Sequence, residues 1–193
     1  MSEQLRGYLA EHLEVARQTE ALLPLVEEVA QAICAALAMG GKLLVCGNGG
    51  SAADAQHFAA ELTGRYRRER QPLPAVALTT DSSALTCIGN DYAFDDVFVR
   101  QVRALTVKGD VVFGITTSGN SPNVVKALSA ARERGAITVA FTGGTGGTVR
   151  EVADYTVVVP SKTTARVQEM HILLIHMLCE RIDDWALSEV QHG

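Results

Sequence analysis

The spacing of apolar residues changes after the first forty positions of the chain. Apolar residues recur every three or four positions through residues 1–40, which predicts a pair of helices. They form two stripes, first Leu5, Leu9, Leu13 and Ala16, and then a broader set made of Leu22, Leu25, Val26, Val29, Ile33 and Leu37. Gly40 and Gly41 are expected to end the second helix.

From residue 42 onward, short apolar runs alternate with helical patterns. The apolar runs predict buried strands at 43–46, 75–78, 110–115, 136–141 and 155–159. The helical patterns lie between and after them, at about 51–64, 82–89, 95–105, 121–134, 147–152 and 164–188. Strands separated by helices predict an α/β fold in which helices cover both faces of a parallel sheet. The absence of an internal repeat or a low-complexity linker indicates one domain over residues 1–193.

The turn after the first strand is rich in glycine. Gly47, Gly49 and Gly50 allow a sharp turn and a close approach to a ligand, and Ser51 is expected to be the N-cap of the next helix. Free backbone N–H groups at a helix start favour an anion, and a phosphate is the best candidate.

The same turn has a second interpretation. Gly47-x-Gly49-x-x-Ala52 fits the dinucleotide fingerprint, with Asp81 as its acidic residue. That pattern is weak by itself, and Asp81 lies further along the chain than the usual spacing. A Walker motif is excluded, because no Lys-Ser or Lys-Thr pair follows the glycines.

A second polar turn follows the strand at 110–115. Ser121 and Pro122 have the order preferred for an N-cap and a first helical residue, which an ordinary helix start explains. Such a start does not require Thr116, Thr117 and Ser118, whose hydroxyl groups favour phosphate binding. Ligands of parallel sheets bind at the carboxyl ends of the strands, where the strand order reverses.

Two candidate proton-transfer or metal-binding residues share one face of the helix at 51–64. His57 and Glu61 are four residues apart, and Asp54 lies on the same face. Such a stripe is more often only a solvated face, and Ser51-x-x-Asp54 is equally an acidic variant of the capping box. His57 and Glu61 lie roughly 9 and 15 Å along the helix from Ser51, within reach of a linear sugar phosphate bound in the turns.

The helix at 164–188 is apolar almost all round and is therefore expected to be buried. Gln168 and His176 lie two turns apart on it. A buried histidine needs a hydrogen bond or a ligand. His171 is expected to be a satisfied core histidine, whereas the residues alone leave His176 open between a core role and a ligand role.

Composition limits the class of protein. The chain is 47% hydrophobic, which is enough for one well-packed domain. Its net charge of -5 argues against a nucleic-acid-binding surface. The arginines at 65–70 are expected to favour the end of the preceding helix, with one available for a substrate anion. The polar N-terminus does not fit a signal peptide, and no apolar run is expected to span a membrane. The scattered cysteines Cys34, Cys46, Cys87 and Cys179 indicate reduced thiols and a soluble, cytoplasmic protein.

Four motifs together resemble the phosphoheptose isomerases, which belong to the sugar-isomerase (SIS) family. They are CGNGGSAADAQHFAAELTGRY (46–66), IGNDYAFDD (88–96), TSGNS (117–121) and RVQEMHILLIH (166–176). The motifs occur in the expected order, and the resemblance extends along nearly the whole chain.

The resemblance implies a flavodoxin-like, three-layer αβα sandwich with a mostly parallel five-stranded sheet. Residues 41–193 would form the sugar-phosphate-binding core, and the helical pair at 1–40 would help to build a homotetramer. The implied reaction converts sedoheptulose 7-phosphate to D-glycero-D-manno-heptose 7-phosphate. This is the first step toward nucleotide-activated heptose for a surface polysaccharide such as lipopolysaccharide.

The resemblance also implies roles for particular residues. One zinc ion per subunit would be held by His57, Glu61, Gln168 and His176. Glu61 and His176 would be catalytic, and Asp54 matches a carboxylate proposed to assist in some members. Substrate contacts are implied for Asn48, Gly49, Gly50, Ser51, Glu61, Asn90, Asp91, Thr116, Thr117, Ser118, Ser121 and Gln168.

Two departures and three alternatives accompany the resemblance. Ala165 stands where some members have an aspartate, and Thr116 replaces a serine but keeps its hydroxyl. A close relative that binds the replication initiator is not an enzyme and lacks the glutamate and the last histidine; Glu61 and His176 are both present here. A non-catalytic sugar-phosphate-binding module and a nucleotide-dependent oxidoreductase are the remaining alternatives, which turnover and NAD-binding assays separate.

Overall fold

The computed structural model describes residues 3–190 of the chain. It begins with α1 (Glu3–Thr19), a single 3-10 turn η1 (Glu20–Leu22) and α2 (Leu23–Ala38). Strands and helices then alternate in the order β1 (Leu43–Gly47), α3 (Gly50–Thr63), β2 (Ala75–Ala77), α4 (Ser82–Asp91), η2 (Phe94–Asp96), α5 (Val99–Leu105), β3 (Val111–Ile115), α6 (Pro122–Glu133), β4 (Ile137–Gly143), α7 (Val149–Val152), β5 (Tyr155–Val159) and α8 (Thr164–Val190). The predicted strands and helices are confirmed, with bounds that differ by a few residues.

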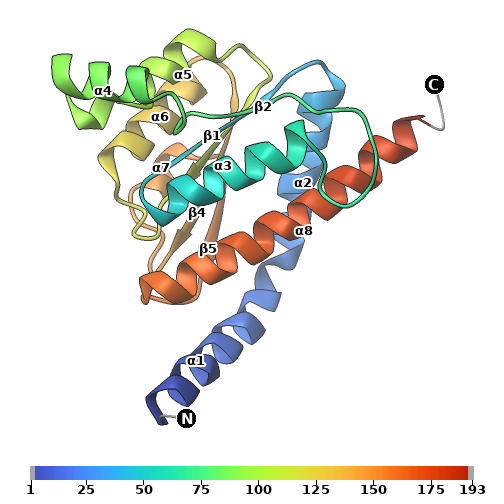
Figure 1. The fold of residues 1–193 in the computed structure, drawn as a ribbon, viewed down its shortest axis with the longest axis vertical. Coiled ribbons are helices and arrows are strands. Elements are labelled where there is room, and N and C mark those ends of the chain that lie inside the picture. The colour runs from blue at the N-terminus through green and yellow to red at the C-terminus, as the bar shows by residue number, and fades with distance from the viewer. Residues whose placement is uncertain (1–2, 191–193) are drawn as a thin grey trace.

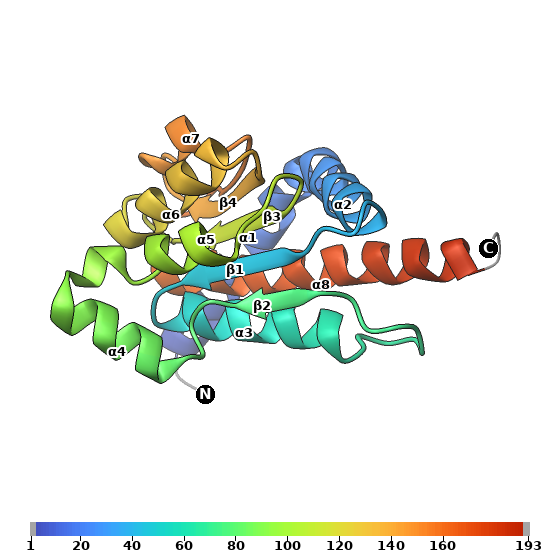
Figure 2. The same cartoon turned by 90° about the horizontal axis from the view of Figure 1, so that it is seen from above.

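The five strands form one parallel sheet in the order β2-β1-β3-β4-β5. Helices α2, α3 and α8 cover one face, and α4 to α7 cover the other, so the fold is a three-layer αβα sandwich (Figures 1 and 2). The chain passes from β1 to the β2 edge of the sheet and then crosses back to β3. The strand order therefore reverses between β1 and β3, and a ligand is expected beyond the carboxyl ends of these two strands.

Successive side chains of each strand point to opposite faces of the sheet, so the core is divided between the two faces. Leu43 and Val45 point toward α2, α3 and α8, whereas Leu44 and Cys46 point toward the opposite helices. On the first face, Phe113 lies between Phe58 and Phe141, with ring centroids 5.4 and 4.6 Å away. These contacts fix α3 against the middle of the sheet.

Helices α3 and α8 lie side by side on this face, with their N-termini at the same end of the sheet (Figure 1). Residues in corresponding turns of the two helices therefore meet. The expectation that α8 is buried all round is wrong, because Leu173 and Met177 are 37% and 36% exposed. Apolar side chains surround more of this helix than the sheet and the neighbouring helices cover.

The prediction that His171 lies in the core is confirmed, but only one of its two ring nitrogens has a hydrogen-bond partner among the described residues. Its side chain is fully buried, and Nε2 lies 3.1 Å from the carbonyl oxygen of Thr142 on β4. Burial lowers the pKa of His171 to about 4, so the ring is neutral at pH 7. Three of the four cysteines, Cys34, Cys46 and Cys179, are also buried as free thiols.

Helix α1 projects from the body of the molecule and contacts it mainly through α8 (Figure 1). Its apolar stripe is largely uncovered in the single chain: Leu9 and Leu13 are 60% and 54% exposed, and Leu5 is also exposed. Val15 and Thr19, at the far end of α1, are buried. The first of the two predicted apolar stripes is therefore present, but most of it faces away from the core of its own chain.

One helical stretch is long and apolar enough, by length and composition alone, to cross a membrane. It runs from Glu3 to Ala38 and contains an 18-residue window of mean hydropathy 1.6. Length and composition alone are weak evidence for a membrane span, because a core helix passes the same test. The second half of the stretch is a core helix, in which Val26, Val29 and Ile33 pack against the sheet.

Candidate active site

A pocket opens where the strand order reverses. It has a volume of about 280 Å³ and lies between the turns that follow β1 and β3 and the start of α8. Its lining consists of Asn48, Gly49, Gly50, Ser51, Ile115, Thr116, Thr117, Ser121, Thr164 and Gln168. The two polar turns that the sequence identified separately therefore form the walls of one site.

The first turn begins α3 earlier than the sequence suggested. Gly49 is the N-cap and has a φ of 57°, a conformation that favours glycine. The helix begins at Gly50, and the amide N–H of Ser51 donates to the carbonyl oxygen of Asn48 at 3.0 Å. The prediction that Ser51 is the N-cap is therefore wrong, because the left-handed turn at Gly49 starts the helix before it.

Gly50 also allows α8 to approach this turn. A Cβ atom at Gly50 would lie 2.9 Å from Cδ of Gln168 and still closer to its amide nitrogen. The side chain of Gln168 thus occupies the space that a larger residue would fill, and it enters the pocket from α8. Gly50 and Gln168, both of which the resemblance implies as substrate contacts, therefore lie against each other at the pocket.

The second turn presents hydroxyl groups to the pocket. Ser121 is the N-cap of α6 and Pro122 lies in its first turn, as predicted, but the Ser121 side chain makes no capping bond. Its Oγ lies 2.9 Å from Oγ1 of Thr116 instead, and Ser118 Oγ lies 3.4 Å from the same atom. The hydroxyl groups of Thr116 and Ser121 therefore lie together at the pocket, and that of Ser121 does not cap the helix.

Another glycine-rich loop supports the second turn from behind. Gly119 has a φ of 72° and packs directly on the backbone of Gly146 and Gly147. The amide of Val149 donates to the Gly119 carbonyl at 3.0 Å, and that of Thr148 donates to Oδ1 of Asn120 at 3.0 Å. These contacts hold the turn rigidly in place.

Sequence reasoning missed two polar residues of the site. Asn123, which is buried, exchanges side-chain amide hydrogen bonds with Asn48 at 2.9 and 2.8 Å and so links the two turns. Thr164 opens α8 and lines the pocket. The polar residues before α8, which directly follow β5, were the available signal for Thr164.

Three further predicted residues gather on the facing sides of α3 and α8. His57 Nε2 lies 2.7 Å from Glu61 Oε1, and the imidazole rings of His57 and His176 meet edge to face at 5.1 Å. One ligand atom from each of the three side chains lies within 4.8 Å of the others. The His57 side chain is 43% exposed and that of Glu61 is 19% exposed. Two imidazoles and a carboxylate at this spacing are a suitable donor set for a divalent metal ion.

Asp54 lies one turn before His57. Burial raises the pKa of Asp54 to about 6, and its Oδ2 atom is buried without a hydrogen-bond partner among the described residues. The capping-box interpretation is wrong, because the start of α3 has no side-chain cap. Asp81 does act as a cap: its carboxylate accepts the amide N–H of Ala84 at 2.9 Å and begins α4. A capping role accounts for Asp81 without a dinucleotide.

The chain is similar to known proteins along most of its length. A family model described as the SIS domain matches residues 7–143. The chain is 58% identical over 159 residues to the phosphoheptose isomerase of Aquifex aeolicus, covering 82% of this chain and 83% of that protein. It is 53% identical over 180 residues to the enzyme of Aliarcobacter butzleri, covering 93% and 95%. The solved phosphoheptose isomerase of Neisseria gonorrhoeae is 50% identical and superposes with a TM-score of 0.90, covering 94% of this chain and 98% of that one.

The chain belongs to the phosphoheptose isomerase family. The resemblance that the four motifs suggested is thereby confirmed, and so is the SIS fold. The members of this family are isomerases by name, and the chain places a polar pocket and a cluster of one carboxylate and two imidazoles along α3 and α8.

The single chain does not bring all residues implied by the phosphoheptose isomerase resemblance to the pocket. Asn90 and Asp91 are exposed at the end of α4, where Asn90 Nδ2 donates to Asp91 Oδ1 at 2.8 Å, and neither lines the pocket. Ser118 is also outside the lining, and its Oγ accepts the backbone N–H of Asn120 at 3.1 Å. Ala165 lies exposed in the first turn of α8.

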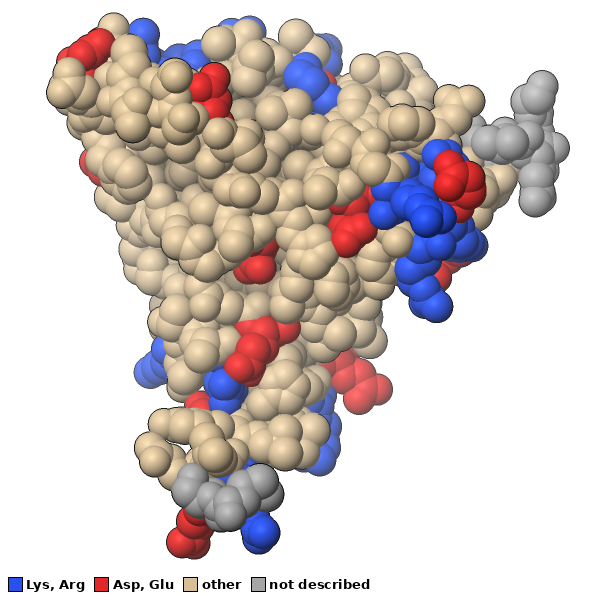
Figure 3. Space-filling view, in the orientation of Figure 1, with Lys and Arg blue, Asp and Glu red and all other residues tan. Residues whose placement is uncertain are grey.

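The arginines that follow α3 are occupied by the protein itself. Arg70 donates to the carbonyl oxygens of Glu61 at 2.7 Å and Leu62 at 2.9 Å, so it stabilises the C-terminal end of α3 as predicted. Arg67 and Arg68 form ion pairs with acidic residues of α8. Blue and red side chains accordingly lie together at one edge of the face drawn in Figure 3.

Proposed function

We propose that this protein converts sedoheptulose 7-phosphate to D-glycero-D-manno-heptose 7-phosphate through an enediol intermediate. The observation that carries the proposal is the meeting of two distant segments: His57 and Glu61 of α3 lie against His176 of α8, beyond a pocket of turns suited to an anion. Family membership supports the reaction, since relatives more than 50% identical are named phosphoheptose isomerase.

The pocket supplies the groups that a phosphate needs. Backbone N–H groups at the start of α3 and the hydroxyl groups of Thr116, Thr117 and Ser121 line it, together with the amide of Gln168. A helix N-terminus with free N–H groups favours a dianion, and hydroxyl donors add further hydrogen bonds. With the phosphate held there, the reacting carbons at the far end of the sugar extend along α3 and α8 toward Glu61 and His176.

Proton transfer falls to Glu61 and His176. The carboxylate of Glu61 removes the proton from carbon 1 of the ketose, and His176 exchanges a proton with the oxygen atoms as the enediol forms and collapses. Return of the proton to carbon 2 gives the aldose. Asp54, with a raised pKa and an unpartnered oxygen, is available on the same helix face to assist.

We propose that the site holds one zinc ion per subunit, bound by His57, Glu61 and His176 with Gln168 as fourth ligand. The fit rests on the donor set, because the three clustered side chains present ligand atoms within 4.8 Å of one another. A bound zinc ion supplies Lewis-acid stabilisation of the oxygen that becomes negative in the enediol.

Metal content provides a test of the zinc site. We expect purified protein to bind zinc, measured by inductively coupled plasma mass spectrometry, and chelation to lower turnover. His57→Ala is expected to weaken zinc binding by more than the roughly 10- to 100-fold that a supporting residue would cost. His12→Ala is the control, since His12 contacts Glu169 outside the cluster. Unchanged zinc affinity in His57→Ala would contradict the assignment.

We further propose a homotetramer in which the N-terminal helices, residues 1–40, contact other subunits of this single SIS domain. The exposed apolar side chains Leu9 and Leu13 support this, as does the exposure of Leu173 and Met177 on α8. Asn90 and Asp91 do not reach the pocket of their own chain, so we propose that they serve the site of a neighbouring subunit.

Charge placed on the stripe of α1 tests the assembly. We expect the double variant Leu9→Glu, Leu13→Glu to dissociate into smaller species, because buried carboxylates would lack partners. Light scattering coupled to size-exclusion chromatography measures the mass. Gln4→Glu, an exposed polar position on the same helix, is expected to leave the mass unchanged. A double variant with the mass of the wild type would refute the interface.

We place the protein in the cytoplasm, without a nucleic-acid or membrane partner. The net charge of -5 supports the absence of a nucleic-acid partner. The free buried thiols support a reducing compartment such as the cytoplasm.

The reaction is tested by incubating the protein with sedoheptulose 7-phosphate and following the aldose by NMR. A tetramer that binds the sugar phosphate without forming the aldose would instead be a sugar-phosphate-binding module. Stabilisation by NAD would favour the oxidoreductase alternative, which we expect to be absent because Asp81 is an N-cap.

A further inference from the structure

The imidazole ring of His176 is held between two aromatic rings. His57 meets it edge to face at a centroid distance of 5.1 Å with an interplanar angle of 72°. On another side, the ring of Tyr66 stacks on it at 5.6 Å with an interplanar angle of 26°. Two contacts of different geometry restrict both the position and the rotation of the imidazole.

Tyr66 belongs to an irregular segment, so its own placement needs an explanation. The segment runs from the end of α3 at Gly64 to Arg70. Asp183 of α8 is fully buried and accepts the backbone N–H groups of Arg67 at 3.2 Å and Arg68 at 3.3 Å. The residues directly after Tyr66 are thus tied to α8, seven residues beyond His176.

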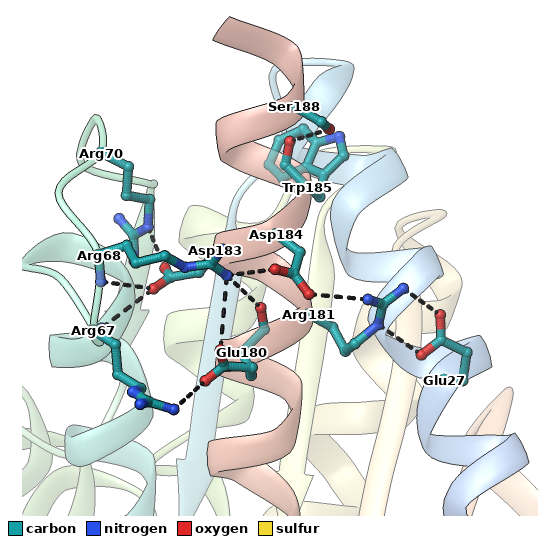
Figure 4. Close-up of polar contacts among 10 residues, drawn as sticks. All are labelled: Glu27, Arg67, Arg68, Arg70, Glu180, Arg181, Asp183, Asp184, Trp185 and Ser188. Atoms are coloured by element: carbon teal, nitrogen blue, oxygen red, sulfur yellow. Dashed lines mark hydrogen bonds and ion pairs between the residues drawn. The ribbon is translucent and has the colours of Figure 1, made fainter. Parts of the chain in front are cut away.

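A buried ion pair completes this anchor. Arg70 Nε donates to Asp183 Oδ1 at 2.7 Å, and both side chains are about 1% exposed. The other guanidinium nitrogens donate to carbonyl oxygens at the end of α3, including that of Glu61 at 2.7 Å. Figure 4 shows this cluster, with Arg70 and the segment of Arg67 and Arg68 converging on Asp183.

A buried pair of this kind is costly unless every polar group is satisfied, and here both partners have several hydrogen bonds. It connects three things: the C-terminal end of the helix that carries Glu61, the segment that carries Tyr66, and the helix that carries His176. Such a connection is much more than the end of α3 requires. It fixes the aromatic ring against the imidazole.

We propose that Tyr66 is a positioning residue, whose ring orients the imidazole of His176 toward Glu61 and His57. This rests on the proposed function, in which His176 acts on the substrate and binds zinc. The ring, and not the hydroxyl, performs the role.

Two substitutions separate the ring from the hydroxyl. Tyr66→Leu removes the ring, and we expect kcat to fall between about 10- and 100-fold, the cost of a misplaced catalytic group. The KM for sedoheptulose 7-phosphate should stay within about two-fold, because the phosphate pocket does not include Tyr66. Tyr66→Phe keeps the ring and is expected to retain kcat.

Zinc affinity gives a readout that does not depend on turnover. Competition with a chromophoric chelator should show about 10-fold weaker zinc binding in Tyr66→Leu and unchanged binding in Tyr66→Phe. Tyr155→Leu is the matched control, since Tyr155 packs against the same core from the amino end of β5, away from the pocket. It is expected to change neither kcat nor zinc affinity.

The outcomes are distinct from those of the proposed function. If Tyr66→Leu keeps both kcat and zinc affinity, or if Tyr66→Phe loses as much as Tyr66→Leu, the positioning role is wrong. If the wild-type protein does not turn over sedoheptulose 7-phosphate but Tyr66→Leu alone weakens zinc binding, the positioning role stands and the proposed reaction is wrong.

Discussion

Glu61→Gln is expected to lose about 10²- to 10⁴-fold in turnover, the usual contribution of a positioned general base. Glutamine keeps the size and most contacts of the side chain but does not accept the proton of carbon 1. Binding of the sugar phosphate should change little, because the phosphate pocket is lined by the two turns and the start of α8. NMR in D₂O measures the formation of aldose and the incorporation of deuterium, at carbon 2 of the aldose and at carbon 1 of the recovered ketose.

Two comparisons make this result interpretable. Glu69→Gln changes the same residue type eight positions later, where the side chain is 85% exposed, and should leave turnover unchanged. Zinc content measured on the Glu61→Gln sample separates loss of the base from loss of the metal, because Glu61 is also a proposed ligand. Turnover within ten-fold of the wild type in Glu61→Gln, with folding intact, would refute its role as base.

The period of the apolar residues was enough to predict an α/β fold with a parallel sheet, but not the order of its strands. Runs such as Leu43–Cys46 and Val111–Ile115 are fully buried strands, and the spacing of helices between them dictates a parallel sheet. The pairing of His57 with Glu61 also follows from spacing alone, since residues four apart meet on one helix face. Both are local properties of the chain.

Non-local properties explain most of what the sequence analysis missed. Tyr66 stacks on His176, and the residues after Tyr66 are bonded to a buried Asp183 more than a hundred residues away; no period reveals either contact. The same holds for Asn48 and Asn123, which link two turns. Ser51 failed as an N-cap for a local reason, the left-handed conformation at Gly49, which glycine permits but does not require.

Gly119→Ala is expected to damage phosphate binding more than any other single substitution in the second turn. A Cβ atom there would lie 2.9 Å from Cα of Gly147 and would overlap the Gly146 carbonyl, and both obstacles are backbone atoms that cannot rotate away. The turn would therefore move away from the loop behind it, taking the hydroxyl groups of Thr116 and Ser121 out of place. Loss of one charge-assisted hydrogen bond, about 1.5–3 kcal/mol, raises KM by about 10- to 100-fold.

Backbone strain alone would also destabilise this variant, and Gly40→Ala isolates that contribution. Gly40 has a φ of 81°, close to the 72° of Gly119, but a Cβ atom there meets nothing within 4 Å. Both variants should lower the melting temperature through the cost of a left-handed conformation, about 1–2 kcal/mol. Only Gly119→Ala should raise the KM in steady-state assays with sedoheptulose 7-phosphate. Equal KM values for Gly119→Ala and the wild type would show that the contact with Gly146 and Gly147 does not hold the phosphate turn in place.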